Sequence, residues 1–249
     1  MTRTKIEPIK TTKTARREAG PRKPSRGLGV VRFNALLAAT EKLLVDHNPD
    51  DVGLYQIAEE AGAPIASAYH FFPTKDAAFL ALAEHYLQRF IALSAEPIEA
   101  AKLRSWQDLF EADCRRTMEY YNAHPPALKI FYSGYGSSAV RQADIRFTTT
   151  IAQSIYRRMD GAFHMPALKN ATKIFHIGLA IMDAVWAISY QQHGEITEEF
   201  FRDGVAAGQA YHRLFLPEYV EPRQACLDAA ARGEMIRLPP LGEFVPQSC

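Results

Sequence analysis

The sequence of 249 residues contains little cysteine. Its three cysteines, Cys114, Cys226 and Cys249, are an odd number and lie far apart. A disulfide framework needs paired cysteines and a zinc site needs clustered ones, so the sequence predicts neither, and we expect no metal and no cofactor. We expect Cys114 to be a small buried hydrophobic residue, with a redox-sensing thiol as the less favoured alternative.

Long hydrophobic runs are also scarce. No segment suggests a membrane span, and the chain does not begin with the charged and apolar regions of a secretion signal, so we expect a cytoplasmic protein. Sustained alternation of period two is missing as well. Apolar residues recur with helical spacing and make up 47% of the chain, enough for a large core. The predicted fold is therefore all-α.

The motifs of helical enzymes are missing too. There is no HExxH, and no histidine has a glutamate three residues before it, so the usual helical metal sites are not encoded. Residues 133–137, Ser-Gly-Tyr-Gly-Ser, match neither G-x-S-x-G nor a Walker sequence. We therefore predict a protein that is not an enzyme.

Positive charge is concentrated at the N-terminus. Residues 1–28 hold nine Lys or Arg and two Glu, a charge of +7, whereas the whole chain carries +1. This arm has too few large apolar residues to fold alone, so we expect it to be disordered until it meets a polyanion. DNA is the favoured polyanion, because each neutralised phosphate releases counterions. A solubilising tail is the alternative.

The most informative pattern covers residues 57–76, which read as two short helices around a turn. Gly62 suits a left-handed cap that ends the first helix. Pro64 suits the start of the second helix, Pro73 ends it, and Thr74 is a natural N-cap for the next one. This arrangement is typical of a helix-turn-helix DNA reader.

The second of these helices, residues 65–72, is only about two turns long. Ser67, Tyr69 and His70 carry hydrogen-bond donors that suit phosphates or base edges. We interpret Phe71 and Phe72 as core residues. The alternative for the whole pattern is ordinary packing of two amphipathic helices, with Tyr69 in the core as well.

Residues 30–90 resemble the DNA-binding domain of the TetR family of bacterial transcriptional regulators. In that family a run of the form IA..AG leads into a recognition helix that ends in Tyr-x-x-Phe, followed by Pro-Ser-Lys-Glu. The matching residues are Ile57, Ala58, Ala61, Gly62, Tyr69, Phe72, Pro73, Lys75 and Asp76, with Thr74 at the serine. The chain departs from the family at Gly53, where a Thr or Ser usually caps the helix, and at Tyr55, where Arg is frequent. The DNA-binding residues that we expect are Tyr55, Ala66, Ser67, Tyr69, His70 and Lys75, of which the resemblance implies phosphate contacts for Tyr69 and Lys75.

The rest of the chain reads as a larger helical domain. We expect a first helix over 30–46 and a long linking helix over 75–93. Further helices are expected over 104–123, 125–133, 139–162, 167–193, 197–216 and 222–231. The predicted domains are a disordered arm (1–28), the helix-turn-helix domain (29–92), an effector-binding and dimerisation domain (93–216) and a C-terminal tail (217–249) that packs on the body or on a neighbour.

The predicted helix over 167–193 contains a single charged residue, Asp183, between Lys173 and Glu195. A buried carboxylate needs a partner, for which we consider His176, a ligand, Arg115 or Arg116. Aromatic residues from several helices would complete a pocket with few polar groups. The candidate ligand-binding residues are Trp106, Phe110, Phe147, Tyr156, His176, Asp183, Trp186 and Tyr190. The alternative is plain core, with Asp183 in an ion pair or a dimer contact.

The resemblance implies a sequence-specific transcriptional regulator. It would be a repressor that is released from a palindromic operator by an apolar or aromatic small molecule, and it would act as a homodimer through a four-helix bundle of the last two long helices. Two short recognition helices are also needed, independently of the resemblance, to read a specific palindrome. A non-specific or architectural DNA-binding protein is the alternative, and an all-helical enzyme is disfavoured.

Overall fold

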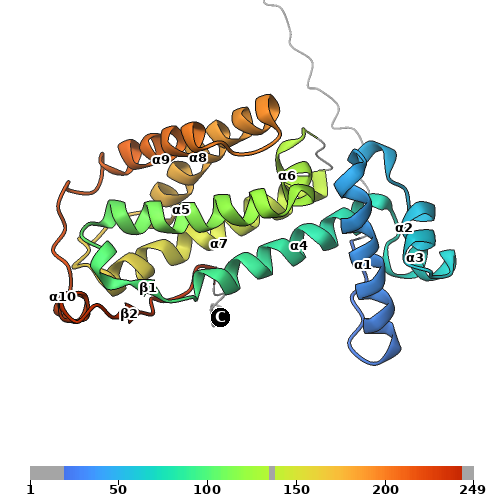
Figure 1. Ribbon diagram of the computed structural model, residues 1–249, viewed down its shortest axis with the longest axis horizontal. Coiled ribbons are helices and arrows are strands. Elements are labelled where there is room, and N and C mark those ends of the chain that lie inside the picture. Colours follow the sequence, from blue (N-terminus) through green and yellow to red (C-terminus); the bar gives the residue numbers. More distant parts are fainter. Residues whose placement is uncertain (1–19, 135–137, 243–249) are drawn as a thin grey trace, which may run out of the picture.

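The computed structural model describes residues 20–134 and 138–242. These residues form an almost entirely helical protein, which confirms the predicted all-α fold (Figure 1). The α-helices are α1 (Leu28–Asp46), α2 (Leu54–Glu60), α3 (Ile65–Phe71), α4 (Lys75–Ser94), α5 (Trp106–Ala123), α6 (Pro125–Tyr132), α7 (Ser138–Ala162), α8 (Ala171–His193), α9 (Glu198–His212) and α10 (Gln224–Ala231). Two short 3₁₀ turns (Pro49–Asp51 and Ala100–Lys102) and two strands, β1 (Ile98–Glu99) and β2 (Met235–Ile236), complete the fold.

The N-terminal helices form a compact unit at one end of the molecule (Figure 1). Its local signals act as predicted: Gly62 has φ 58°, and the Thr74 hydroxyl accepts a hydrogen bond from the Ala77 amide at 3.1 Å. Leu36, Ile57 and Phe72 are fully buried and hold the helices together. The linking helix α4 leaves this unit and runs along the larger domain, so both domains share one rigid element.

In the larger domain, α8 and α9 lie along one side, with α5 and α7 between them and α4 (Figure 1). The helices α8 and α9 approach closely because glycines stand at their crossing. A Cβ added to Gly178 would lie 2.1 Å from the His212 ring, and one added to Gly204 would lie 2.7 Å from Trp186. No side chain fits at either position, so these glycines fix the spacing of the two helices.

Helix α8 corrects the expectation that no segment has the length and hydrophobicity of a membrane span. By length and composition its 23 residues meet that requirement, with a mean hydropathy of 1.4 over the most apolar window. The helix nevertheless packs between α7 and α9. Only 28% of that window is buried within this single chain. Helix α8 is therefore apolar on a face that its own chain leaves uncovered.

The segment after α9 returns to the body. The predicted helix over 222–231 corresponds to α10, and β2 pairs antiparallel with β1, with Ile98 opposite Ile236. Residues 20–27 also lie against the protein: the Arg22 amide donates to the Phe71 carbonyl at 2.8 Å, and Lys23 pairs with Glu84 at 2.6 Å. The expected disorder of the arm therefore does not extend to these residues, and residues 1–19 lie outside the described part.

Candidate nucleic-acid interface and effector cavity

Helix α3 packs one face on the N-terminal core and leaves the opposite face exposed to solvent. Ala68 and Phe71 are buried against the N-terminal core, whereas Ala66, Tyr69 and His70 are exposed and Ser67 is half-buried. Helix α2 adds Tyr55, which is 71% exposed. All of these predicted DNA-binding residues are accessible to a large ligand, and their role in binding DNA stays a prediction.

The two phenylalanines at the end of α3 have the core role that their positions predicted. Phe71 is 6% exposed and Phe72 is fully buried. Both rings contact Phe33 of α1, with ring centroids 5.7 and 5.1 Å apart. The recognition helix is thus fixed at its C-terminal end to α1.

Lys75 stands at the first position of α4 and caps the neighbouring 3₁₀ turn. Its Nζ donates to the carbonyls of Pro49 at 3.4 Å and Asp50 at 3.2 Å. At the start of α2 no side chain caps the helix, because Gly53 has none; its amide instead donates to Gln56 Oε1 at 2.7 Å. The departure from the family pattern at Gly53 therefore removes a hydroxyl without removing the local hydrogen bond.

A cavity opens in the larger domain between α4, α5, α6, α7 and α8. It has about 880 Å³ of empty space, part of it open to solvent. Most of its wall is apolar or aromatic. The aromatic residues that line it are Phe90, Phe110, Tyr121, Phe131, Tyr132 and Phe147.

Of the eight predicted ligand-binding residues, the structure brings Phe110, Phe147 and Asp183 to this cavity. Trp106 and Trp186 are fully buried in the core instead: the Trp106 indole donates to the Pro217 carbonyl at 3.0 Å, and Trp186 stacks on Phe201. Helical spacing identified both as apolar-face residues but could not show which neighbours they meet.

The other three predicted residues also lie outside the cavity lining. The Tyr156 hydroxyl donates to the Pro166 carbonyl at 3.1 Å, which turns this side chain toward the loop after α7. His176 contacts Thr149 of α7, with 3.3 Å between Nδ1 and the hydroxyl. Tyr190 is half-buried and lies beside Tyr132, with ring centroids 6.4 Å apart.

The partner of Asp183 is a residue that the sequence did not suggest. The Tyr132 hydroxyl of α6 donates to Asp183 Oδ1 at 3.1 Å. Burial, followed by the nearby charge of Asp144, raises the pKa of Asp183 to about 7, and the Tyr132 hydrogen bond opposes this rise. The carboxyl of Asp144 also has a raised pKa because it is largely buried. The cavity therefore holds two carboxyl groups whose charge is disfavoured by their surroundings.

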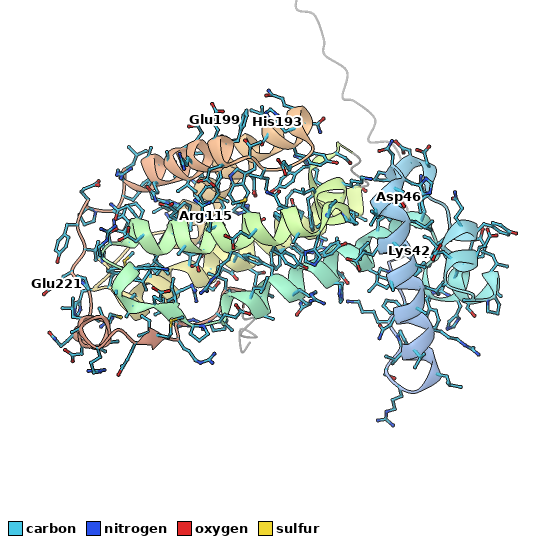
Figure 2. The ribbon with its side chains drawn as sticks, viewed as in Figure 1. Lys42, Asp46, Arg115, His193, Glu199 and Glu221 are labelled. Carbon is cyan, nitrogen blue, oxygen red and sulfur yellow. The ribbon has the colours of Figure 1, made fainter. Side chains whose placement is uncertain are left out.

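The arginines considered as partners for Asp183 are occupied elsewhere. Arg115 lies in the middle of α5 (Figure 2). It pairs with Glu198 of α9 at 2.5 Å and lies over the Phe201 ring. Arg116 donates to the backbone carbonyls of Glu96 at 3.2 Å and Pro97 at 2.6 Å. Among the described residues, Asp183 thus has no arginine partner.

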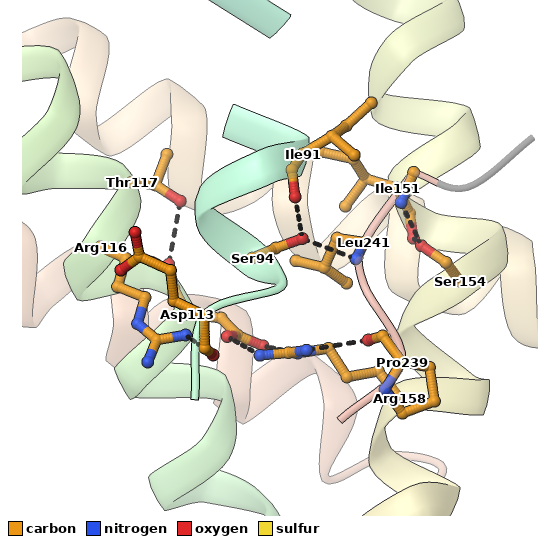
Figure 3. Close-up of polar contacts among 12 residues, drawn as sticks. Ile91, Ser94, Asp113, Arg116, Thr117, Ile151, Ser154, Arg158, Pro239 and Leu241 are labelled. Carbon is orange, nitrogen blue, oxygen red and sulfur yellow. Dashed lines mark hydrogen bonds and ion pairs between the residues drawn. The ribbon is translucent and has the colours of Figure 1, made fainter. Parts of the chain in front are cut away.

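Asp113 and Arg158 form a buried ion pair in the cavity wall (Figure 3). Two nitrogens of Arg158 meet the two oxygens of Asp113 at 2.7 and 2.8 Å, and a third donates to the Pro239 carbonyl at 2.8 Å. Each nitrogen of the Arg158 guanidinium therefore has an acceptor, and the C-terminal segment supplies one of them.

The C-terminal segment over residues 238–242 lies between α4 and α7, beside the cavity (Figure 3). Ser94 of α4 accepts a hydrogen bond from the Leu241 amide, and Ser154 of α7 accepts one from the Gly242 amide, both at 2.8 Å. Leu241 itself lines the cavity. Sequence reasoning placed this tail on the body or a neighbour but missed its part in the cavity; the only signal was the sequence Pro-Pro-Leu-Gly at 239–242.

The geometry defines a class of protein: an exposed helix-turn-helix domain joined by α4 to a helical domain that contains an aromatic cavity. Residues 36–82 match the family described as "Bacterial regulatory proteins, tetR family". The matched segment lies within helices α1 to α4 and identifies the N-terminal unit as a TetR-type helix-turn-helix domain.

Solved structures share the fold over most of their length. A TetR-family transcriptional regulator from Streptomyces coelicolor is 16% identical, with 75% of this chain and 98% of that chain covered and a TM-score of 0.53. A TetR transcriptional regulator from Rhodococcus sp. RHA1 is also 16% identical, with 73% and 94% covered and a TM-score of 0.54. A structure described as a SmeT–triclosan complex is 15% identical, with 76% and 93% covered and a TM-score of 0.52. Among curated proteins, no match was found.

Proposed function

We propose that the protein is a homodimeric repressor that a small molecule releases from a palindromic operator. One observation carries the proposal: α6 touches both the cavity and the DNA-binding unit. Its Tyr132 binds Asp183 in the cavity, and its Lys129 donates to the carbonyls of Val45 at 2.8 Å and His47 at 3.2 Å, where α1 ends. A protein with the same fold is described as a complex with triclosan, which supports small-molecule binding by this protein.

A ligand acts through this route if it favours one arrangement of the two domains. Binding beside Asp183 changes the partner of Tyr132 and so biases the position of α6. Helix α6 is only eight residues long, so a shift at Tyr132 reaches Lys129 and the end of α1 directly. Helix α4 supplies a second connection, because it runs from Lys75 to the cavity residue Phe90. Both connections would change the separation of two recognition helices in a dimer, which must match the spacing of the half-sites.

The dimer is supported by an apolar stripe on α8 and α9 that the single chain leaves exposed. The stripe recurs every four residues on both helices. Its members are Ala180, Ala184 and Ile188 on α8 and Ala206 and Ala210 on α9, and Leu214 continues it in the turn after α9. Ile188 is 49% and Leu214 is 72% exposed. Two such helix pairs would bury the stripe in a four-helix bundle with small residues at the closest approach.

Selection from a randomised DNA library tests the proposed specificity. We expect the ligand-free protein to enrich an inverted repeat and to bind it about a thousandfold or more tightly than random DNA. Tyr69→Ala should weaken binding to the selected site. Tyr219→Ala, which removes a similarly exposed tyrosine from the far domain, should leave binding unchanged. Equal affinity for selected and random DNA would instead indicate a non-specific DNA-binding protein.

Sedimentation equilibrium tests the dimer separately. Ile188→Asp places a charge in the proposed interface and should yield monomers, because two buried carboxylates would face each other across the symmetry axis. Leu227→Asp, at a similarly exposed leucine on α10, should leave the dimer intact. A wild-type protein that sediments as a monomer contradicts the proposed interface.

A further inference from the structure

The charges in the cavity do not balance. Asp113, Asp144 and Asp183 line it, whereas Arg158 is the one basic residue in its described wall. The guanidinium of Arg158 is bound to both oxygens of Asp113, so it is not available to the other two carboxyl groups. In the described part of the chain, neither Asp144 nor Asp183 forms an ion pair.

In the described part of the chain, one hydrogen bond and no ion pair reach these two carboxyls. Tyr132 of α6 donates to Asp183, and Tyr121 and Cys114 of α5 lie in the same wall. Burial raises the pKa of Asp144, and the charges of Arg141 and His176 only partly oppose this rise. A buried carboxylate without a cation costs free energy, which a cationic ligand would recover.

The aromatic walls favour the same kind of ligand. Tyr121, Phe131 and Phe147 line the cavity with the carboxyl groups. Aromatic faces attract cations and stack on planar rings, and their apolar area excludes water. An anionic ligand would meet two carboxyls and only one guanidinium, which is already bound. A neutral apolar ligand would leave the carboxyls as they are.

We propose that the cavity binds an aromatic organic cation, with its protonated amine beside Asp144 and Asp183 and its ring among Tyr121, Phe131 and Phe147. This inference rests on the proposed function only in using the same cavity, because it concerns binding to the protein without DNA. It narrows the effector from an apolar or aromatic compound to one that carries positive charge.

Three indole compounds that differ in their terminal group test the proposal by calorimetry on the full chain. Tryptamine carries an ammonium, tryptophol a hydroxyl and indole-3-acetate a carboxylate. At pH 8 we expect tryptamine to bind about tenfold or more tightly than tryptophol, as a charge-assisted hydrogen bond implies, and indole-3-acetate to bind most weakly. Equal affinities, tighter binding of indole-3-acetate, or no binding of tryptamine would overturn the proposal.

Variants locate the effect. Asp183→Asn and Asp144→Asn should each weaken tryptamine binding by about tenfold and change tryptophol binding by less than about threefold. Asp228→Asn, at an exposed aspartate on α10, is the matched control and should change neither. An unchanged tryptamine affinity in both cavity variants would place the ligand elsewhere and overturn the assignment.

A measurement on the wild type keeps the test decisive if a variant does not fold. The carboxyl of Asp183, with a pKa of about 7, is partly protonated at neutral pH, so a bound cation should drive its proton off. Calorimetry in buffers of different ionisation enthalpy should show proton release with tryptamine at pH 7 and none with tryptophol. Absence of proton release contradicts the proposal. DNA selection with ligand-free protein is independent of these results, so failure of the repressor proposal is recognised separately.

Discussion

The two hydrophobic cores of this molecule differ in the polar side chains that they bury. In the described N-terminal core, tyrosines aside, Thr40 is the only buried polar side chain, and its hydroxyl bonds to the Leu36 carbonyl one turn earlier in the same helix. The larger domain buries Arg158 and His212, together with three serines that bind other parts of the chain. The DNA-binding unit thus keeps its polar contacts, such as those of Lys75 and Lys23, near the surface, whereas the larger domain also buries polar contacts between distant segments.

This difference suits the two proposed roles. A reading surface needs a fixed backbone, which close packing of Ala and Phe provides. A cavity that responds to ligand needs groups whose partners can change, and buried polar groups supply them because each has a few discrete arrangements. Substitution of a buried polar residue should therefore lower the free energy of unfolding little in the DNA-binding unit and much in the larger domain.

The largest effect is expected at the buried ion pair. Arg158→Met leaves the Asp113 carboxylate without its cation and should lower the free energy of unfolding by about 3–5 kcal/mol. Arg202→Met removes an exposed ion pair with Glu198 and should cost less than about 1 kcal/mol. Urea unfolding of both variants measures the difference. Equal small costs would show that the larger core does not depend on this pair.

The next largest effect should be the loss of stability that His212 causes as the pH falls. His212 is fully buried among the rings of Trp106, Phe110 and Phe175, and this burial lowers its pKa to about 4. The unfolded chain binds a proton near pH 6.5 and the folded one does not, so stability is present above that pH and falls as the pH drops toward 4. The total loss should be about 3 kcal/mol.

Unfolding measured at several pH values between 6.5 and 5 checks this effect before most carboxyl groups titrate. Replacement of His212 by leucine should flatten the pH dependence of stability by up to about 1.4 kcal/mol per pH unit. His164→Leu, at an exposed histidine, is the control and should keep the wild-type slope. An unaltered slope in the His212 variant would mean that this group does not couple to folding.

The two regions also differ in how far they could be predicted. Gly62, Thr74 and Phe72 lie in a local motif, where each role depends on neighbours within a few residues, and all three have the expected structural role. The partner of Asp183 is Tyr132, fifty-one residues away, and helical periodicity does not encode which helices meet. The C-terminal segment was unpredictable for the same reason, since its acceptors lie on α4 and α7.

A moderate loss of stability is expected when a hydrogen bond to the C-terminal segment over residues 238–242 is removed. Ser94→Ala leaves the buried Leu241 amide without its acceptor and should cost about 1–3 kcal/mol of unfolding free energy. Thr40→Val is the matched change in the N-terminal core. Its hydroxyl bond repeats a contact that the helix backbone already makes, so the cost should stay below about 1 kcal/mol. The comparison fails if the threonine change costs as much as the serine change.

The smallest loss of stability is expected for two lysines that both donate hydrogen bonds to backbone carbonyls. The same pair best separates a structural role from a role in DNA binding. Lys75 donates to carbonyls of the turn before α2, and Lys129 donates to carbonyls at the end of α1. Each alanine variant should lose only about 1 kcal/mol of stability, because these are hydrogen bonds near the surface. Only Lys75, at the start of α4, is predicted to bind a phosphate. For Lys75→Ala we therefore expect weaker binding to all DNA sequences and a slope of log affinity against log salt that is smaller by about one, whereas Lys129→Ala should keep the wild-type slope. Equal salt slopes in both variants would leave Lys75 with a structural role alone.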